Sequence, residues 1–183
     1  DLSNAYIQTD KDNRVFKDKY QGIPETGYTK LIENILNHKN IKVLFDIDFK
    51  NIDANGFDRI FYTGSIDEFF NYKFGILQYK SAKFEISEIE KEFYQNAGIV
   101  KYPYNHDFLK IHEFKHYSNI KCDKTVIAKE YIEDFKPNTD TERFYPVLSK
   151  KNLEIFNRYK IEAKKFKDVY FLGRLGDFKN YSM

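Results

Sequence analysis

The sequence predicts a mixed fold, an α/β layer interrupted by an antiparallel β insertion, which makes the chain α+β overall. Helical spacing of apolar residues and strand-like runs occur before residue 80 and again after residue 136. Between them, short β-prone runs alternate with polar turns. The chain also has 15 Tyr and 18 Phe, which favour half-buried sheet faces. We therefore expect three regions, 1–80, 81–135 and 136–183, without an independent linker.

The first region is expected to hold one helix and two strands. Apolar residues at helical spacing predict an amphipathic helix over 28–38 with one face packed on a core. The runs 42–45 and 59–63 predict strands, and Asn55-Gly56 between them is typical of a turn.

A short helix should follow the second strand. Ser65 and Glu68 have the spacing of a capping box, so the helix should begin at Ser65 and carry Phe69 and Phe70 inward.

The other two regions complete the fold. Strands in the insertion are expected over 83–86, 98–102, 108–117 and 125–131. Afterwards the chain should return to α/β structure, with a helical stripe over 153–166, a strand over 169–172 and a turn at Gly173-Arg174-Leu175-Gly176.

Composition excludes several classes of protein. With 30 Lys and Arg against 28 Asp and Glu, the interleaved charge disfavours nucleic acid and anionic membranes. The apolar runs are far below the ~20 residues of a membrane span, and the start lacks signal-peptide features; we expect a cytoplasmic protein. The lone Cys122 cannot form an internal disulfide or a cysteine metal cluster. A first residue that is not Met indicates an excised piece.

One literal motif suggests a zinc peptidase. His112, Glu113 and His116 match H-E-x-x-H, which needs a helix to place both histidines on one face. This segment alternates like a strand, on which the two histidines would lie about 13 Å apart at ~3.3 Å per residue. A third ligand would have to be a distant acid such as Glu130 or Glu133. We expect no metal site, and a zinc metallopeptidase is kept as an alternative interpretation.

Four segments together carry a family resemblance. They are Tyr20–Pro24 with Gly27–Glu33, Tyr62–Phe70 with Tyr72–Gly75, Glu113–Tyr117, and Phe144–Val147 with Gly173–Gly176. In this order and spacing the chain resembles the C-terminal portion of the UDP-galactopyranose mutase family.

The resemblance implies a flavoenzyme of surface-polysaccharide synthesis. Members are isomerases (intramolecular transferases) that use reduced FAD to interconvert UDP-galactopyranose and UDP-galactofuranose without net redox change. It also implies part of a Rossmann-like FAD-binding layer, a multi-stranded substrate-side sheet and a homodimer. No G-x-G-x-x-G fingerprint occurs in this sequence, so we expect this chain alone not to retain FAD and to be inactive.

The resemblance assigns residues unevenly. Cofactor-binding positions are Gly173, Arg174, Thr63, Gly64 and the tail Tyr181, Ser182 and Met183, where Ser182 stands in place of a usual Asp. At the substrate positions Tyr145 keeps a diphosphate-contacting Tyr. The remaining substrate positions depart from the family: Asn4 and Lys110 replace arginines, Val15 and Asn180 replace tyrosines, and Val100 replaces an Asn.

These departures leave alternatives open. Lys110 offers a point charge where an Arg offers a bidentate fork, so the protein could be a diverged mutase-like enzyme with another nucleotide sugar, or could have lost activity. A non-enzymatic module is a further class, but it has no need for an Arg between glycines at a strand end.

Overall fold

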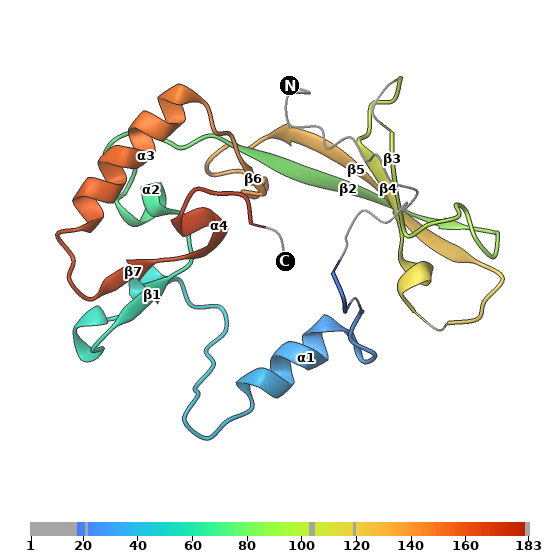
Figure 1. The fold of residues 1–183 in the computed structure, drawn as a ribbon, viewed down its shortest axis with the longest axis horizontal. Coiled ribbons are helices and arrows are strands. Elements are labelled where there is room, and N and C mark those ends of the chain that lie inside the picture. Colours follow the sequence, from blue (N-terminus) through green and yellow to red (C-terminus); the bar gives the residue numbers. More distant parts are fainter. Residues whose placement is uncertain (1–17, 21, 103–104, 119, 182–183) are drawn as a thin grey trace. The chain divides into compact units, whose positions relative to one another are not determined.

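The computed structural model describes residues 18–20, 22–102, 105–118 and 120–181. The chain forms two compact units, residues 1–45 and 46–183. Helices and strands are mixed, with one antiparallel and one parallel sheet in the second unit (Figure 1). The mixed α and β class predicted from the sequence is confirmed at this level.

The first unit contains helix α1, Gly27–Leu36, which confirms the predicted helix. Its apolar face was expected to pack on a core, but no residue of α1 is buried and Ile35 is 61% exposed. The strand predicted over 42–45 is also wrong, because these residues adopt no regular structure. A helix forms its hydrogen bonds within one segment, whereas a strand needs a partner.

The second unit begins with two short 3₁₀ turns, η1 (Phe49–Asn51) and η2 (Ala54–Gly56). Each is capped by an aspartate, since Asp48 accepts from Lys50 N at 2.8 Å and Asp53 accepts from Asn55 N at 3.0 Å. The predicted turn at Asn55-Gly56 is thereby confirmed.

A two-stranded parallel sheet follows, formed by β1 (Ile60–Tyr62) and β7 (Val169–Phe171). Both strands were predicted. Alternate residues point to opposite faces, so Tyr62 and Phe171 share one face and Phe61 and Tyr170 share the other. The rings of Tyr62 and Phe171 meet at 5.8 Å, and Phe69 packs on both.

Helix α2 (Ile66–Phe69) begins after Ser65, as predicted, but without the capping box. The Ser65 hydroxyl hydrogen-bonds the Asp67 carboxylate instead. Asp67 also accepts from Glu68 N at 3.0 Å and from Leu77 N at 2.9 Å. The Ser65 hydroxyl was expected to accept a hydrogen bond from a backbone N–H of the helix. It instead donates to the buried Asp67 carboxylate, two residues further along the chain.

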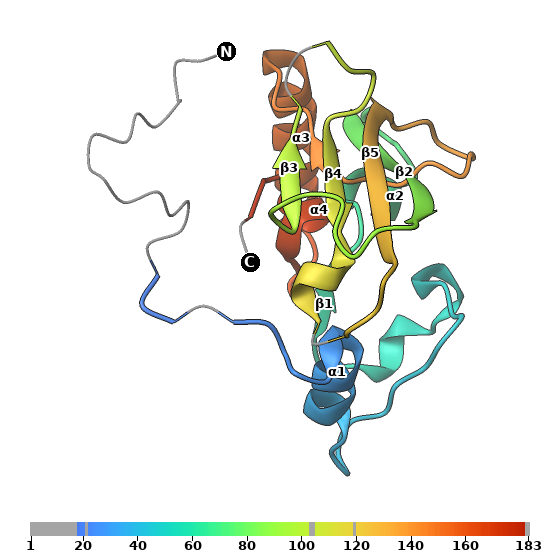
Figure 2. The same cartoon turned by 90° about the vertical axis from the view of Figure 1, so that its right-hand side faces the viewer.

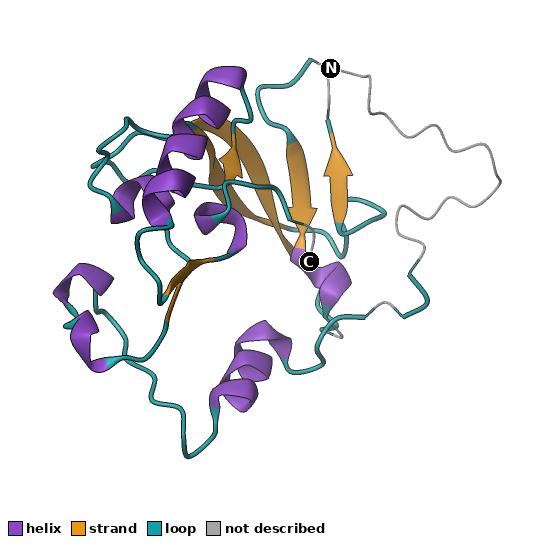
Figure 3. Ribbon diagram, turned by 60° about the vertical axis from the view of Figure 1, so that its left-hand side comes forward, coloured by secondary structure: helices purple, strands orange, loops and turns teal. Residues whose placement is uncertain are grey.

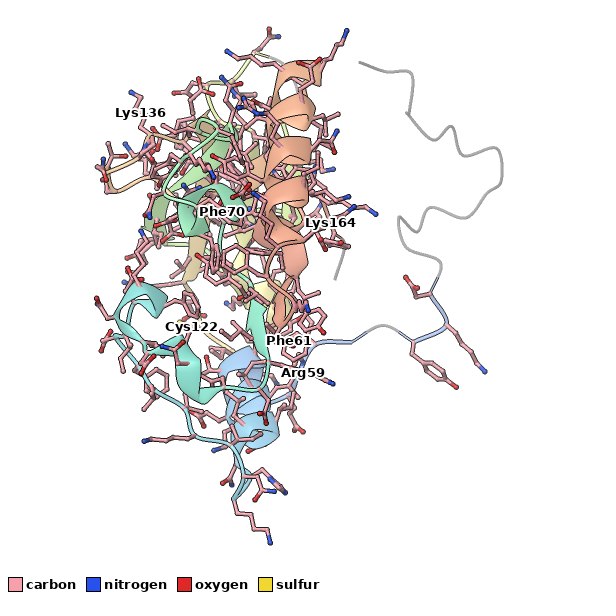
Figure 4. All side chains as sticks on the ribbon, turned by 90° about the vertical axis from the view of Figure 1, so that its left-hand side faces the viewer. Arg59, Phe61, Phe70, Cys122, Lys136 and Lys164 are labelled. Carbon is pink, nitrogen blue, oxygen red and sulfur yellow. The ribbon has the colours of Figure 1, made fainter. Side chains whose placement is uncertain are left out.

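The core of this unit lies between α2 and α3 (Lys150–Ala163). Its buried members are Ile66, Leu77, Tyr79, Tyr159 and Phe178. Phe70 stacks on Tyr159 at 5.8 Å between the centroids, and Figure 4 labels Phe70 beside helix α3.

Five strands form an antiparallel sheet in the order β3-β4-β5-β2-β6 (Figure 2). Their bounds are β2 Tyr79–Ile89, β3 Ile99–Lys101, β4 Lys110–Glu113, β5 Thr125–Asp134 and β6 Tyr145–Pro146. The predicted strand over 108–117 is shorter, because η3 (Phe114–Tyr117) follows β4. The short strand β6 was not predicted.

Residues 173–176 form a short helical turn rather than a plain turn, α4 (Gly173–Gly176), one residue after β7 (Figure 3). Gly173 has φ +77, a conformation that side chains with a Cβ rarely adopt. Among the described residues, no helix is long and apolar enough to cross a membrane.

Candidate functional site

The first group of candidate residues gathers at α4. The Arg174 guanidinium donates to the Phe144 carbonyl at 3.0 Å and to the Tyr181 carbonyl at 3.1 Å. It also lies 5.6 Å from the centre of the Tyr145 ring. The structure therefore brings together three residues, Tyr145, Arg174 and Tyr181, that the sequence places 36 positions apart at most.

Arg174 keeps capacity for a ligand. A guanidinium has five N–H donors, and two carry these carbonyl bonds. Because both bonds fix the plane of the fork, its remaining donors point in defined directions. Such a fork suits phosphate oxygens or a flavin carbonyl.

Tyr79 ties α4 to the five-stranded sheet. Its hydroxyl donates to the Leu175 carbonyl at 3.4 Å and lies 3.4 Å from the Ser65 hydroxyl oxygen. Burial, with a smaller effect of the Asp67 charge, raises the pKa of Tyr79 to about 12. The phenol therefore stays protonated and remains a donor at any working pH.

The Thr63-Gly64 segment follows β1 and lies close to α4. Leu172 N donates to the Tyr62 carbonyl at 3.0 Å. A Cβ on Gly176 would lie 3.2 Å from that carbonyl oxygen, so the absence of a side chain lets α4 approach both strands. The parallel sheet thus places the end of β1 and the Gly173-Arg174 turn next to each other.

The segment before Tyr145 is anchored by a buried arginine. Arg143 donates to Glu68 at 3.0 Å and to the Tyr72 hydroxyl at 3.1 Å, and its guanidinium lies 4.2 Å from the Phe135 ring centre. This residue was not predicted from the sequence. It fixes the chain immediately before the carbonyl that Arg174 binds.

A second group lies on the five-stranded sheet around Glu130, which is 2% exposed. Lys110 Nζ lies 2.8 Å and His112 Nε2 lies 2.7 Å from the same oxygen, Glu130 Oε2. Lys110 and Glu130 are direct partners in the register of β4 and β5, and Phe84 of β2 is the partner of Glu130 on its other side. Residues opposite each other share a face, so the sheet places these side chains in one row.

Aromatic rings connect the two groups. Phe84 lies 5.9 Å from the His112 ring and 6.3 Å from the Phe144 ring, and Phe144 lies 5.8 Å from Tyr145. We call His112, Phe84, Phe144 and Tyr145 the ring row. It runs from the Lys110–Glu130 pair to Arg174.

Other candidates lie apart from the ring row. Val100 is the partner of Ile111 in the register of β3 and β4, so strand alternation puts it on the face opposite Lys110. Asn180 is exposed, in the segment between α4 and Tyr181. Asn4, Val15, Ser182 and Met183 lie outside the described residues.

The H-E-x-x-H residues make hydrogen bonds to neighbouring segments. Glu113 accepts from Tyr94 N at 2.9 Å, from Gln95 N at 2.9 Å and from the Thr125 hydroxyl at 2.7 Å. Burial alone would raise its pKa, but these hydrogen bonds lower the pKa of Glu113 below its ordinary value. Within the described part of the chain, no group of three His, Cys, Asp or Glu side chains could hold a metal ion.

Sequence reasoning missed that His112 and Glu130 contact each other beside Lys110 on one face of the sheet. Both had been considered only as zinc ligands, His112 from the motif and Glu130 as a distant acid. The alternation of 110 and 112 along β4 was visible in the sequence, but the register that sets Glu130 opposite Lys110 was not.

Cations at both ends of a row of aromatic rings suit a ligand that has phosphate groups and flat or ring-shaped parts. A protein-family model described as UDP-galactopyranose mutase matches residues 2–180. The chain belongs to the UDP-galactopyranose mutase family.

Curated relatives agree with this assignment. The chain is 31% identical to the dTDP-fucopyranose mutase of Escherichia coli, with 100% of the chain and 50% of the relative covered. It is 28% identical to the probable UDP-galactopyranose mutase of Klebsiella pneumoniae (100% and 47% covered) and 28% identical to the UDP-galactopyranose mutase of Mycoplasma genitalium (89% and 44% covered). The chain spans about half the length of the curated relatives it matches.

Proposed function

We propose that this chain provides the substrate-facing sheet and part of the cofactor site of a mutase that interconverts UDP-galactopyranose and UDP-galactofuranose. The proposal rests on one observation in a chain of this family. The Phe144 and Tyr181 carbonyls accept hydrogen bonds from Arg174 and hold its guanidinium beside the Tyr145 ring. A departing diphosphate needs oriented cations, and a guanidinium held in one plane supplies them without reorganisation.

FAD is the cofactor that the family implies. The donors that Arg174 keeps, together with the close approach of the Tyr62 ring to Gly64 and the positive φ of Gly173, fit such a group. In the proposal these residues and Tyr181 hold it, and the β1–β7 sheet belongs to a Rossmann-like FAD-binding layer. Reduced FAD supplies the nucleophilic chemistry when bound.

The residues of this chain would bind the substrate and exclude water from it. The Tyr145 hydroxyl would bind phosphate oxygens of the substrate at one end of the ring row, beside the Arg174 that would hold the cofactor. Lys110 would bind the diphosphate from the sheet, and the aromatic rings would exclude water from the reacting sugar. A homodimer in the cytoplasm, and lack of activity of the chain alone, are also part of the proposal.

A second candidate is a mutase for another nucleotide sugar. The Escherichia coli relative is named for dTDP-fucopyranose, and Lys110 replaces the arginine expected on the sheet. A protein that has kept the fold but lost the activity is the third outcome to be tested.

The test uses the intact protein, with its flavin absorbance recorded first. After reduction with dithionite, conversion of UDP-galactopyranose and of dTDP-fucopyranose is followed by chromatography. We expect a yellow protein that converts UDP-galactopyranose only when reduced. Conversion of the dTDP-sugar alone would favour the second candidate, no turnover would favour lost activity, and a colourless protein would contradict the flavoenzyme.

The variant Arg174→Ala tests the residue that carries the proposal. Loss of one oriented cation beside developing charge should lower turnover by about 100-fold or remove the flavin. Arg59→Ala is the matched control, because Arg59, labelled in Figure 4, is exposed and makes no hydrogen bond or ion pair with another described residue. Equal activity of both variants would contradict the assignment of Arg174.

A further inference from the structure

One carboxylate oxygen in the sheet is shared by two side chains. Glu130 Oε2 meets the ammonium of Lys110 at 2.8 Å and the Nε2 of His112 at 2.7 Å. An ionised carboxylate only accepts hydrogen bonds, so His112 donates from Nε2. The other oxygen, Oε1, is buried and has no hydrogen-bond partner among the described residues.

This arrangement limits what Lys110 can do. Glu130 is 2% exposed, and a buried carboxylate needs its partners because an unpaired buried charge is costly. Without another donor, Glu130 would hold the Lys110 ammonium tightly. The positive charge of Lys110 would then be neutralised within the sheet and would contribute little to binding a ligand anion.

His112 changes that balance. Its ring donates to the same Glu130 oxygen, so the carboxylate keeps a hydrogen bond when Lys110 turns away. The Lys110 side chain is 17% exposed, and its ammonium has three N–H donors. The Lys110 ammonium makes no further hydrogen bond or ion pair with the described residues, so its movement breaks only the contact with Glu130.

We propose that His112 is a positioning residue which releases Lys110 from Glu130, so that the Lys110 ammonium can bind a phosphate oxygen of a nucleoside diphosphate. The inference rests on the proposed function for the class of ligand. In this scheme Glu130 and the ligand phosphate compete for one ammonium. His112 favours the ligand in this competition, because its ring N–H gives Glu130 a hydrogen bond that replaces the contact with Lys110.

The test is the affinity of the intact protein for UDP, measured by isothermal titration calorimetry on oxidised protein, so that no turnover is needed. His112→Phe removes the donor while keeping a ring beside Phe84, and should weaken UDP binding about tenfold, the effect of one hydrogen bond to a charged group. His112→Gln keeps a donor and should bind within about twofold of the wild type.

The double variant His112→Phe with Glu130→Gln distinguishes the release of Lys110 from a general disruption of the site by the His112 substitution. Once Glu130 is neutral, nothing competes for Lys110, so UDP affinity should recover at least to the wild-type level. No recovery in the double variant would overturn the proposal, as would unchanged binding by His112→Phe. If His112→Phe does not fold, Glu130→Gln alone decides, since the competition requires it to bind UDP more tightly than the wild type.

Two controls keep this test apart from that of the proposed function. His116→Gln changes the same residue type three positions after Glu113 and should leave UDP affinity unchanged, because His116 contacts Glu113 and the Gln95 carbonyl instead. Lys110→Ala must weaken UDP binding, or the phosphate contact is wrong. A flavin-free or inactive protein would contradict the mutase proposal, yet this pattern of UDP affinities would still be measurable.

Discussion

Glu113 shows how a single residue can have a different role from the one its motif suggests. In H-E-x-x-H the glutamate polarises a water molecule, but here the carboxylate accepts three hydrogen bonds from the 94–95 segment and Thr125. These donors come from a loop and from β5, both distant in the sequence. A buried glutamate with three donors is a structural anchor for the end of β4.

Glu113 should make the free energy of unfolding depend on pH in the acidic range. Because its folded-state pKa is lowered, the unfolded chain takes up the proton first as pH falls, so the contribution of Glu113 is present above its ordinary pKa and is lost as pH falls through the folded pKa. Glu113→Gln should therefore unfold more easily at pH 7, by about 2 kcal/mol, and the difference from wild type should shrink toward pH 3.

Urea denaturation at several pH values measures this difference in the intact protein. Glu133→Gln is the control, because the Glu133 side chain is exposed and makes no hydrogen bond or ion pair with another described residue. A constant difference between Glu113→Gln and wild type at all pH values would contradict the lowered pKa.

At the scale of elements, the junction of β7 and α4 places Arg174. Gly173 has φ +77 and is the first residue of α4, directly after the extended Leu172. An alanine there is strained whatever space surrounds it. The conformation of this one glycine therefore aims the following arginine at the Phe144 and Tyr181 carbonyls.

Gly173→Ala should destabilise the protein by about 1 kcal/mol and should lower the melting temperature measured by circular dichroism. Gly56→Ala is the matched control, since Gly56 has no positive φ and a Cβ would meet nothing within 4 Å. Equal melting temperatures for the two variants would show that the Gly173 backbone is not strained by a side chain.

At the scale of the whole second unit, Tyr159 joins helix α3 to the segment that leads into β2. Its buried hydroxyl accepts from Phe74 N at 3.0 Å and donates to the Gly75 carbonyl at 2.7 Å. Its ring also packs on Phe70 and Phe74. One side chain of α3 thus contacts the segment that connects α2 to β2 of the five-stranded sheet.

Tyr159→Phe keeps the ring but leaves the partly buried Phe74 N–H and Gly75 carbonyl without this partner. The free energy of unfolding should fall by about 1–3 kcal/mol, as measured by urea denaturation. Tyr170→Phe should have little effect, because Tyr170 is 42% exposed and its hydroxyl makes no hydrogen bond with the described residues. A loss of stability as large for Tyr170→Phe would contradict this account of Tyr159.

The sequence by itself determined the classes of the main elements and the family resemblance. Helical spacing predicted α1 and α3, and β-prone runs predicted β1, β5 and β7, because these patterns are local properties of a segment. Prediction was wrong for residues 42–45 and incomplete for β6. A strand depends on a partner that local sequence does not reveal.

Only the tertiary structure decided the composition of the candidate site. Strand register set Glu130 opposite Lys110 and Val100 on the opposite face, and the packing of α4 brought Arg174 to the Phe144 carbonyl. The Lys110–Glu130 and Phe144–Arg174 contacts join residues that are 20 and 30 positions apart. Register and packing are chosen by the summed burial of whole strands and helices, so no single motif in the sequence could specify them.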